Sequence, residues 1–245
     1  MFADILTVTW KELKEFAMQR GSVRATLTSV LLMMVVFGVF LPLQSGRAWV
    51  ESPVSLVAWA WMPLFLVTSM IADSFAGERE RHTLETLLAS RLSDRAILLG
   101  KVLAGITYSL SMTVVLLVVG LVTVNVSDWT GTLVLYPLAT LVGFLIFGTL
   151  GAALVAGIGV LVSLRAATVR QAAQSLSIGI LLLVWIPVLS ISLFPEDMKN
   201  RLLPALLELD GRLVVIALLA ALFLVDVVVL ALALSRFQRN RLILD

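Results

Sequence analysis

Long stretches without charged residues divide this 245-residue chain. Six of them run over 25–46, 52–72, 102–127, 129–164, 171–195 and 213–235, and only Asp226 interrupts the last. A membrane-spanning helix needs about 20 mostly apolar residues. The pattern therefore predicts an all-α membrane protein, a single domain over 1–245 with six transmembrane helices. The fourth stretch is too long for one simple crossing, so we predict one long helix over 133–164 with an irregular start near Tyr136 and Pro137.

The composition supports a membrane location. Hydrophobic residues make up 60% of the chain and charged residues 14%, against roughly 45–50% and about 25% in a soluble domain. A net charge of +2 is too small to indicate a nucleic-acid partner. Membrane lipid is the partner that the composition predicts.

The distribution of positive charge predicts the orientation. Of the 18 Lys and Arg residues, 14 fall in the N-terminal segment, the second–third loop, the fourth–fifth loop and the C-terminal tail. The opposite side receives the other four, which are Arg47, Lys199, Arg201 and Arg212. Positively charged loops stay on the cytoplasmic side. We therefore expect a multi-pass protein of the plasma (cell inner) membrane with both termini in the cytoplasm.

Two amphipathic segments lie outside the predicted spans. The first, over 1–23, repeats apolar residues at helical spacing, opposite Lys11, Lys14 and Glu15: Leu6, Trp10, Leu13 and Ala17. This pattern predicts a helix lying flat on the inner membrane surface; an ordinary juxtamembrane helix is the alternative. The second, over 196–211, is predicted to be an external amphipathic segment at the outer interface.

The loop between the second and third spans is too regular to be a linker. Leu84, Leu87 and Leu88 form an apolar stripe at helical spacing. Two pairs four residues apart, Glu78–His82 and Arg81–Glu85, would support a helix. We predict a surface helix over 76–92. Ser93 then has the character of an N-cap, with Asp94 opening the helix that becomes span three. On these residues alone, a passive interfacial helix remains an equal interpretation.

The same loop resembles the signature loop of ABC-2 type ABC transporter permeases. The matching residues are Glu-Arg-Glu-Arg-His-Thr-Leu-Glu-Thr-Leu-Leu-Ala-Ser over 78–90, Ser-Asp-Arg-Ala-Ile over 93–97, and Gly100-Lys101. The order of elements also matches the family, although only residues 73–101 are specific. The chain departs from the family pattern at His82, where Gly or another small residue is more common, and at Arg91-Leu92, where Pro is common.

The resemblance implies that 76–92 is a coupling helix, which docks on a separate cytoplasmic ATP-binding subunit. It implies a permease, more often an exporter, working with a second copy or a sibling permease, while the partner subunit binds ATP and Mg. It also suggests that 196–211 is partly re-entrant. The residues implied in ATPase coupling are Glu78, Arg79, Glu80, Arg81, His82, Thr83, Leu84, Glu85, Leu87 and Leu88.

Nothing in the sequence predicts catalysis by this chain. Gly100-Lys101 is not a phosphate-binding loop, because Val102 follows it and Arg95 replaces the first glycine. Gly157 and Gly159 lack the third glycine of a dinucleotide motif and are better explained by helix packing. The chain has no cysteine and one histidine, so neither a metal site nor a cysteine nucleophile is expected. We expect no enzyme activity and no bound cofactor.

Three residues inside the predicted spans are candidates for a substrate path. Asp226 falls near the middle of the last span, where a carboxylate is costly and is a functional candidate; the alternative is a protonated or hydrogen-bonded packing residue. Pro63 and Pro187 are expected to kink spans two and five. In span four, small residues recur every fourth position and predict internal helix packing rather than a subunit interface: Gly148, Ala152 and Ala156.

Two other functions remain open at this stage. A secondary transporter or channel could use Asp226 as its ion site, and its transport would follow a proton gradient without ATP. A non-transporting membrane scaffold would bind a partner through the loop helix without moving any substrate.

Overall fold

The computed structural model describes residues 1–19, 28, 30–52, 55, 59–193 and 211–237. The described chain is all helical and contains no strand. Its helices are α1 (Phe2–Gln19), η1 (Met34–Phe40), α3 (Leu41–Ser45), α4 (Ala48–Glu51), α6 (Met62–Glu80), α7 (Leu84–Leu88), α8 (Asp94–Ser127), α9 (Leu138–Arg165), α10 (Val169–Leu193) and α12 (Gly211–Arg236). The π-helix η1 lies inside a longer helical stretch, Val30–Ser45.

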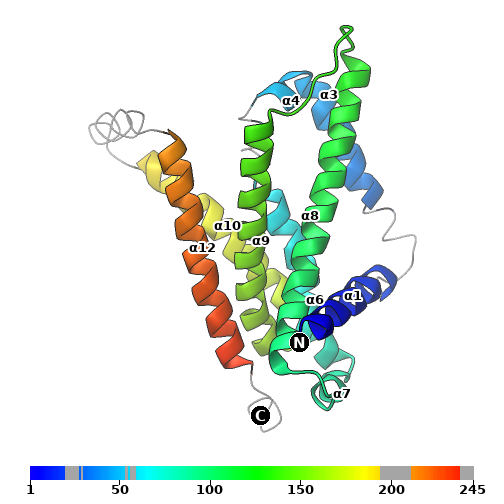
Figure 1. Ribbon diagram of the computed structural model, residues 1–245, viewed down its shortest axis with the longest axis vertical. Helices are drawn as coiled ribbons and strands as arrows, with labels where there is room; N and C mark the ends of the chain where they lie inside the picture. Colours follow the sequence, from blue (N-terminus) through cyan, green and yellow to red (C-terminus); the bar gives the residue numbers. More distant parts are fainter. Residues whose placement is uncertain (20–27, 29, 53–54, 56–58, 194–210, 238–245) are drawn as a thin grey trace.

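Three of these helices, α8, α9 and α12, are long and apolar enough to cross a membrane. Shorter apolar helices cover Val30–Ser45 and Val169–Leu183. The long helices run along one common direction (Figure 1). Helices α1 and α7 and the last turn of α12 lie at one end of the bundle, and α3 and α4 lie at the other. The fold therefore gathers segments far apart in the sequence at one end.

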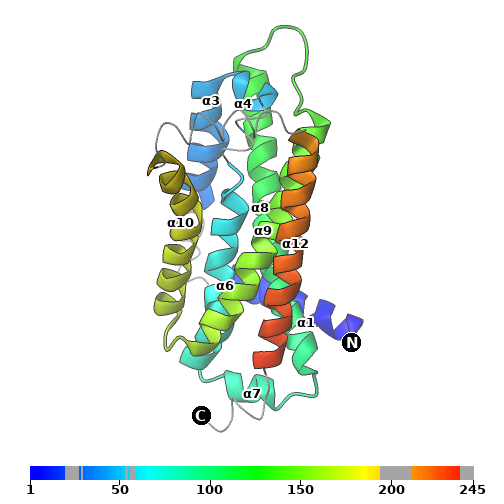
Figure 2. The same cartoon turned by 90° about the vertical axis from the view of Figure 1, so that its left-hand side faces the viewer.

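Helix α6 is the centre of the bundle. It packs against α8, α9 and α10, whereas α12 packs mainly against α9. Figure 2 shows α10 and α12 flanking this centre from opposite sides. The main core joins buried residues of α6, α8 and α9, among them Ile71, Phe75, Ile97 and Val160.

Glycines on α9 allow its close approach to α6. A Cβ on Gly148 would lie 3.0 Å from Pro63 Cγ, and one on Gly151 would lie 2.6 Å from Leu64 Cδ1. Ala152 and Ala156 are fully buried in the same seam. Small residues are what brings membrane helices together, because lipid supplies no hydrophobic force between them. The small-residue ridge of α9 is thus an internal packing surface of this chain, as predicted.

Several helix boundaries agree with the sequence analysis. Helix α8 begins at Asp94, and the Ser93 hydroxyl oxygen accepts a 3.2 Å hydrogen bond from the Ala96 N–H, which confirms the predicted N-cap. Helix α9 begins only at Leu138, after an irregular stretch that includes Tyr136 and Pro137.

The second predicted span, 52–72, is wrong in position. Helix α6 starts ten residues later, at Met62, and continues to Glu80. Pro63 lies in its first turn, where the missing N–H costs nothing, so this proline starts the helix and does not kink it. Helix α6 continues past the apolar stretch because neighbouring helices provide partners for the charged residues of its last turn.

Some predicted segments fall outside the description. Residues 20–27, much of 52–58 and nearly all of 196–211 are not described. Pro187 lies within α10, but its side chain is outside the described part. The predicted kink at Pro187 stays a prediction.

The α6–α9 seam gives a test of packing. We predict that Gly159→Ala lowers the stability of the protein by about 1–3 kcal/mol, because its Cβ would collide with Ile71 Cγ2, next to a branched carbon that cannot move aside. Gly143→Ala is the matched control, since no atom lies within 4 Å of its Cβ position. Thermal unfolding in detergent gives the melting temperature of each variant. Equal melting temperatures would contradict close packing of Gly159 against Ile71.

Candidate functional site

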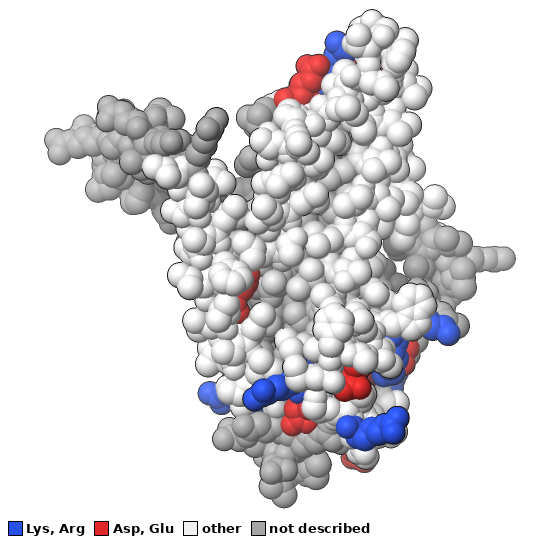
Figure 3. Space-filling model, in the orientation of Figure 1, with Lys and Arg blue, Asp and Glu red and all other residues white. Residues whose placement is uncertain are grey.

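Charged side chains collect at one end of the molecule. Figure 3 shows most of the Lys, Arg, Asp and Glu side chains on this face at the end that holds α1 and α7, with a smaller group at the opposite end and a nearly uncharged surface between them. Helices α1, α6, α7, α8, α9 and α10 all contribute residues to this end. The residues that the family resemblance singles out, from Glu78 to Lys101, lie in this region.

Lys101 is the centre of a buried ion-pair cluster. Its side chain has no exposed surface. The Nζ atom donates to Glu12 Oε1 at 2.8 Å, to the Ser74 carbonyl at 2.8 Å and to Glu78 Oε1 at 2.9 Å. It also lies 5.1 Å from the centre of the Phe75 ring. Three donor bonds satisfy all three ammonium protons, so the lysine joins α1, α6 and α8 at one point.

A second lysine completes this Lys101 cluster, which consists of Lys101, Glu12, Glu78 and Lys11. Lys11 Nζ lies 3.7 Å from both Glu12 Oε1 and Glu78 Oε1. Glu78 is 4% exposed and lies beyond the apolar stretch of α6. Burial raises the pKa of the Glu78 carboxyl, and the charge of Lys101 opposes that rise. Its Oε2 atom has no hydrogen-bond partner in the described chain.

The glycine before Lys101 fixes how closely α1 approaches α8. A Cβ on Gly100 would lie 2.6 Å from Val8 Cβ and 3.1 Å from the Ile5 carbonyl oxygen. The buried Thr9 hydroxyl donates to the Gly100 carbonyl at 3.1 Å. Gly100 and Lys101 therefore act together. The glycine leaves room for the backbone of α1 to approach α8, and the lysine holds α1 there through its ion pair with Glu12.

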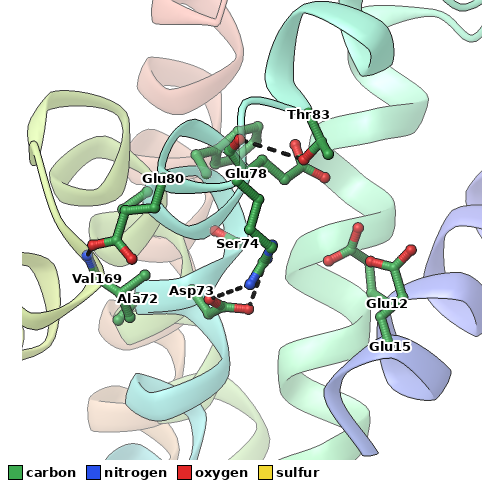
Figure 4. Close-up of polar contacts among 12 residues, drawn as sticks. Glu12, Glu15, Ala72, Asp73, Ser74, Glu78, Glu80, Thr83 and Val169 are labelled. Carbon is green, nitrogen blue, oxygen red and sulfur yellow. Dashed lines mark hydrogen bonds and ion pairs between the residues drawn. The ribbon is translucent and has the colours of Figure 1, made fainter. Parts of the chain in front are cut away.

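Figure 4 shows how the last turn of α6 contacts its neighbours. Arg79 donates to the Leu164 and Ala166 carbonyls at 2.7 Å each, at the C-terminal end of α9. Glu80 Oε1 accepts from the Val169 N–H at 2.8 Å, at the first residue of α10 (Figure 4). Helix ends leave such carbonyl and N–H groups without partners. The two side chains thus cap both sides of the α9–α10 junction.

Helix α6 ends in a Schellman motif at His82. The Thr83 N–H donates to the Glu78 carbonyl at 2.9 Å and the His82 N–H to the Arg79 carbonyl at 3.1 Å. His82 has φ of +55°, a left-handed conformation that favours glycine. In the permease loop that this segment resembles, a small residue is expected at this position, and here a histidine takes the strained geometry.

The predicted continuous helix over 76–92 is therefore wrong. The turn at Arg81 and His82 divides it into the end of α6 and the short helix α7. The predicted Glu78–His82 and Arg81–Glu85 pairs do not form, because the positive φ at His82 breaks the helical register. Arg81 instead makes a double hydrogen bond to Asp73, at 3.1 and 3.2 Å.

Two leucines attach helix α7 to the bundle. Leu84 and Leu87 are half-buried and pack against the main core, as the apolar stripe predicts. The side chain of Leu88 is outside the described part. Glu85 and Thr86 are exposed, as are Thr83 and His82. Helix α7 therefore exposes a small polar surface on one side, while its leucines pack against the core on the other.

The substrate-path candidates do not come together with this region. Asp226 is 3% exposed on α12, and both carboxylate oxygens lack a hydrogen-bond partner in the described chain. Pro63 packs against Gly148 in the first turn of α6, at the other end of that helix from α7. Among the described residues, no group of three His, Asp or Glu side chains could hold a metal ion.

Sequence reasoning missed the partnership of Lys101 with Glu12. The two residues are 89 positions apart, and α1 was expected to turn its charges to the solvent. One signal was present, since Lys101 is a single charge directly before a long apolar run. A lysine there needs a carboxylate from another element, but the sequence does not show which one.

The Lys101 cluster yields a stability prediction. We expect Lys101→Met to destabilise the protein by about 3–5 kcal/mol, because Glu12 and Glu78 would lose their hydrogen-bonded counter-charge and keep only the more distant Lys11 at 3.7 Å. Lys14→Met is the matched control on exposed surface of α1. Denaturant titration of the purified protein compares them, and a K101M variant as stable as K14M would contradict the assigned role.

The turn at His82 yields a prediction of the opposite sign. His82→Gly should stabilise the protein by about 1 kcal/mol, because glycine adopts a positive φ without strain. His82→Ala keeps the strain and serves as the control. Melting temperatures decide the matter; a gain in H82A equal to that in H82G would show that the backbone conformation is not the cause.

Comparison with known families agrees with this architecture. A family model described as ABC-2 family transporter protein matches residues 48–207, more than half of the 245-residue chain. No curated protein matches the chain. The matched range includes α6, α7, α8 and α9 together with the Glu78–Lys101 segment. The chain belongs to the ABC-2 transporter family of multi-pass membrane proteins.

Proposed function

We propose that this chain is the transmembrane permease subunit of an ATP-driven ABC transporter that works as an exporter. The observation that carries the proposal lies within the range of the family match: a short exposed helix, α7, follows the last turn of α6 and packs Leu84 and Leu87 against the main core. A separate subunit would bind ATP and Mg and supply the energy, because we expect no catalysis by this chain. Substrate would move by alternating access between two arrangements of the helices.

The structure describes three helices that are long and apolar enough to cross a membrane, α8, α9 and α12. We propose three further crossings, by the shorter stretch Val30–Ser45 and by α6 and α10, which makes six. Six crossings place both ends of the chain on one side, and α1 and the last turn of α12 do lie at the same end (Figure 1). The excess of Lys and Arg in the connecting segments assigns that side to the cytoplasm. We propose the plasma membrane as the location of the chain in this orientation.

Helix α1 suits the membrane surface. Its Phe2, Leu6 and Trp10 side chains are 74%, 48% and 71% exposed and recur every fourth residue. They would enter the lipid interface, while the opposite side of α1 packs on α8 through Val8 and Glu12. Membrane lipid is thus a partner of this chain.

The contacts around α7 provide a path for coupling. A force on α7 reaches the core through Leu84 and Leu87. From α6 it reaches α9 and α10 through Arg79 and Glu80, and α1 and α8 through the Lys101 cluster. Rigid elements that move together are what converts closure of one subunit into rearrangement of another. The coupling residues from Glu78 to Leu88 thus divide into a set that holds the helices and a set that meets the ATPase.

Contacts within the chain separate these two sets. Glu78, Arg79 and Glu80 are bonded to other helices, whereas Glu85 and Thr86 on α7 are exposed and make no side-chain hydrogen bond to the described residues. We assign contact with the ATPase to Glu85 and Thr86. A second permease copy or a sibling permease would complete the transporter, since one chain of this size forms only one wall of a central path.

An ion-coupled secondary transporter is the second candidate, and the buried Asp226 favours it. Transport that follows a proton gradient and persists without ATP would support that candidate. A non-transporting scaffold would show a stable partner and no substrate movement.

Reversing one exposed charge tests the proposal. We predict that Glu85→Lys reduces co-purification of the ATPase subunit at least about tenfold, because a charge-assisted contact becomes a repulsive one. Glu51→Lys, an exposed acidic residue near the opposite end of the bundle, is the matched control.

Both variants should fold alike, since the structure gives neither side chain a polar contact. Loss of the ATPase in E85K alone supports the proposal. Absence of any stoichiometric ATPase in the purified native complex would contradict it.

A further inference from the structure

The carboxylate of Asp226 is the only charged group of α12 that faces the bundle interior among the residues described. Apart from Asp226, the described residue that α12 buries is Ala233, two turns further along. Between them, Val229 packs against Gly157 of α9, since a Cβ on that glycine would lie 2.8 Å from Val229 Cγ1. Asp226 therefore points into the seam between α12 and α9. Figure 3 shows acidic atoms in this seam, far from both charged ends of the molecule.

Packing does not explain an acidic residue at this position. Both oxygens are buried and lack a hydrogen-bond partner in the described chain. In apolar surroundings an ionised carboxylate needs a counter-charge, and a neutral one needs an acceptor for its proton. The described Lys and Arg residues do not provide the charge, since Arg236 is ten positions away, about 15 Å along the helix, and Lys101 is engaged with Glu12 and Glu78. Asp226 thus lacks a positive partner.

An apolar groove lies on the same face of α12. It has a volume of about 440 Å³ and runs between the first turns of α9 and α12. Gly143, Phe144 and Phe147 line one wall, and Leu218 and Leu219 line the other. Leu219 is seven residues before Asp226, which is two helical turns or about 10 Å along the same face. The lining of the groove thus ends two helical turns from the carboxylate, on the same face of α12.

The two features together define the chemistry of a ligand. We infer that Asp226 and this groove form a binding site for a lipophilic organic cation, with its apolar body in the groove and its positive charge toward the carboxylate. A groove of this volume is in the range of small-molecule sites, and its two phenyl rings can contact a cation or an aromatic group. A bare metal ion fits less well, because the described chain offers no second or third acidic ligand.

This inference deepens the proposed function, on which it rests for transport, because it names the substrate class of the permease. Binding itself is independent of the ATPase. Tetraphenylphosphonium is a suitable probe, and tetraphenylborate has nearly the same size and shape with the opposite charge. Equilibrium dialysis of each probe against the purified full-length protein in detergent separates charge recognition from apolar partitioning.

Two substitutions test the two halves of the site. Asp226→Asn removes the charge and keeps the shape, and Gly143→Leu places a side chain in the groove, since Gly143 lines it and an added Cβ there meets no atom within 4 Å. Gly179→Leu is the matched control, because Gly179 of α10 is equally open but does not line the groove. We expect tetraphenylphosphonium to bind about tenfold or more weakly to D226N and to G143L, and to G179L as to the native protein.

Each other outcome overturns the inference. Equal binding of the cation to native protein and D226N would exclude recognition of charge by Asp226. Equal binding of tetraphenylborate would indicate a merely apolar groove. Melting that depends on pH through Asp226, with no binding of the cation, would indicate a proton as the only ligand. If D226N fails to fold, G143L against G179L still decides.

The result is also separable from the proposed function. Cation binding without an associated ATPase would keep this site and overturn the ATP-driven transporter. An ATPase that associates through α7, with no cation bound, would support the ATP-driven transporter and overturn the cation site.

Discussion

Lys101 has no exposed side-chain surface, and its ammonium group is held by two carboxylates and one backbone carbonyl from two other helices. A buried charge is tolerated only when its partners are in place. Formation of this cluster therefore requires α1, the end of α6 and the start of α8 to meet in one arrangement. The rest of the charged end of the molecule is built around that constraint, because α7 and the α9–α10 junction both attach to the same last turns of α6.

Within the bundle, geometry rather than charge determines the contacts. Glycines on α9 and α8 bring helices close together where apolar side chains alone give no preference in lipid. Gly159 faces Ile71 and Gly100 faces Val8. The bundle thus has small-residue contacts along its length and a network of polar contacts at one end. Such a division suits a transporter, since a partner subunit can bind the polar end while the helices slide or rotate along their apolar contacts.

The sequence predicts the elements whose cause is local. Charge-free stretches mark the long helices, because a span must satisfy its backbone internally and avoid charge. Ser93 as an N-cap and the late start of α9 near Pro137 are also local effects, and both are confirmed. The apolar stripe of α7 was predicted from its spacing, and Leu84 and Leu87 do pack on the core.

What the sequence could not predict depends on distant partners. Helix α6 extends to Glu80 because Arg79 and Glu80 cap helices that begin or end some 85 residues later. The left-handed turn at His82 is not visible in the sequence, because histidine disfavours a positive φ and glycine would be expected there. The pairing of Lys101 with Glu12 follows only once α1 lies across α8. These are the contacts that build the candidate site, so the helices were easier to predict than the site.

In the proposed transporter, α1, α7 and the ends of α6 and α8 form one rigid unit, which a separate ATPase would move as a whole. The chain contains no cysteine, so spin labels can be placed at Thr7 on α1 and Thr86 on α7, both exposed, without removing native thiols. Pulsed electron spin resonance on the complete transporter would measure the Thr7–Thr86 distance within one copy and the Thr86–Thr86 distance between two permease copies. If these helices form one rigid unit, ATP binding will leave the distance within the copy unchanged and will change the distance between copies. A changed distance within the copy, or no change in either, would contradict it.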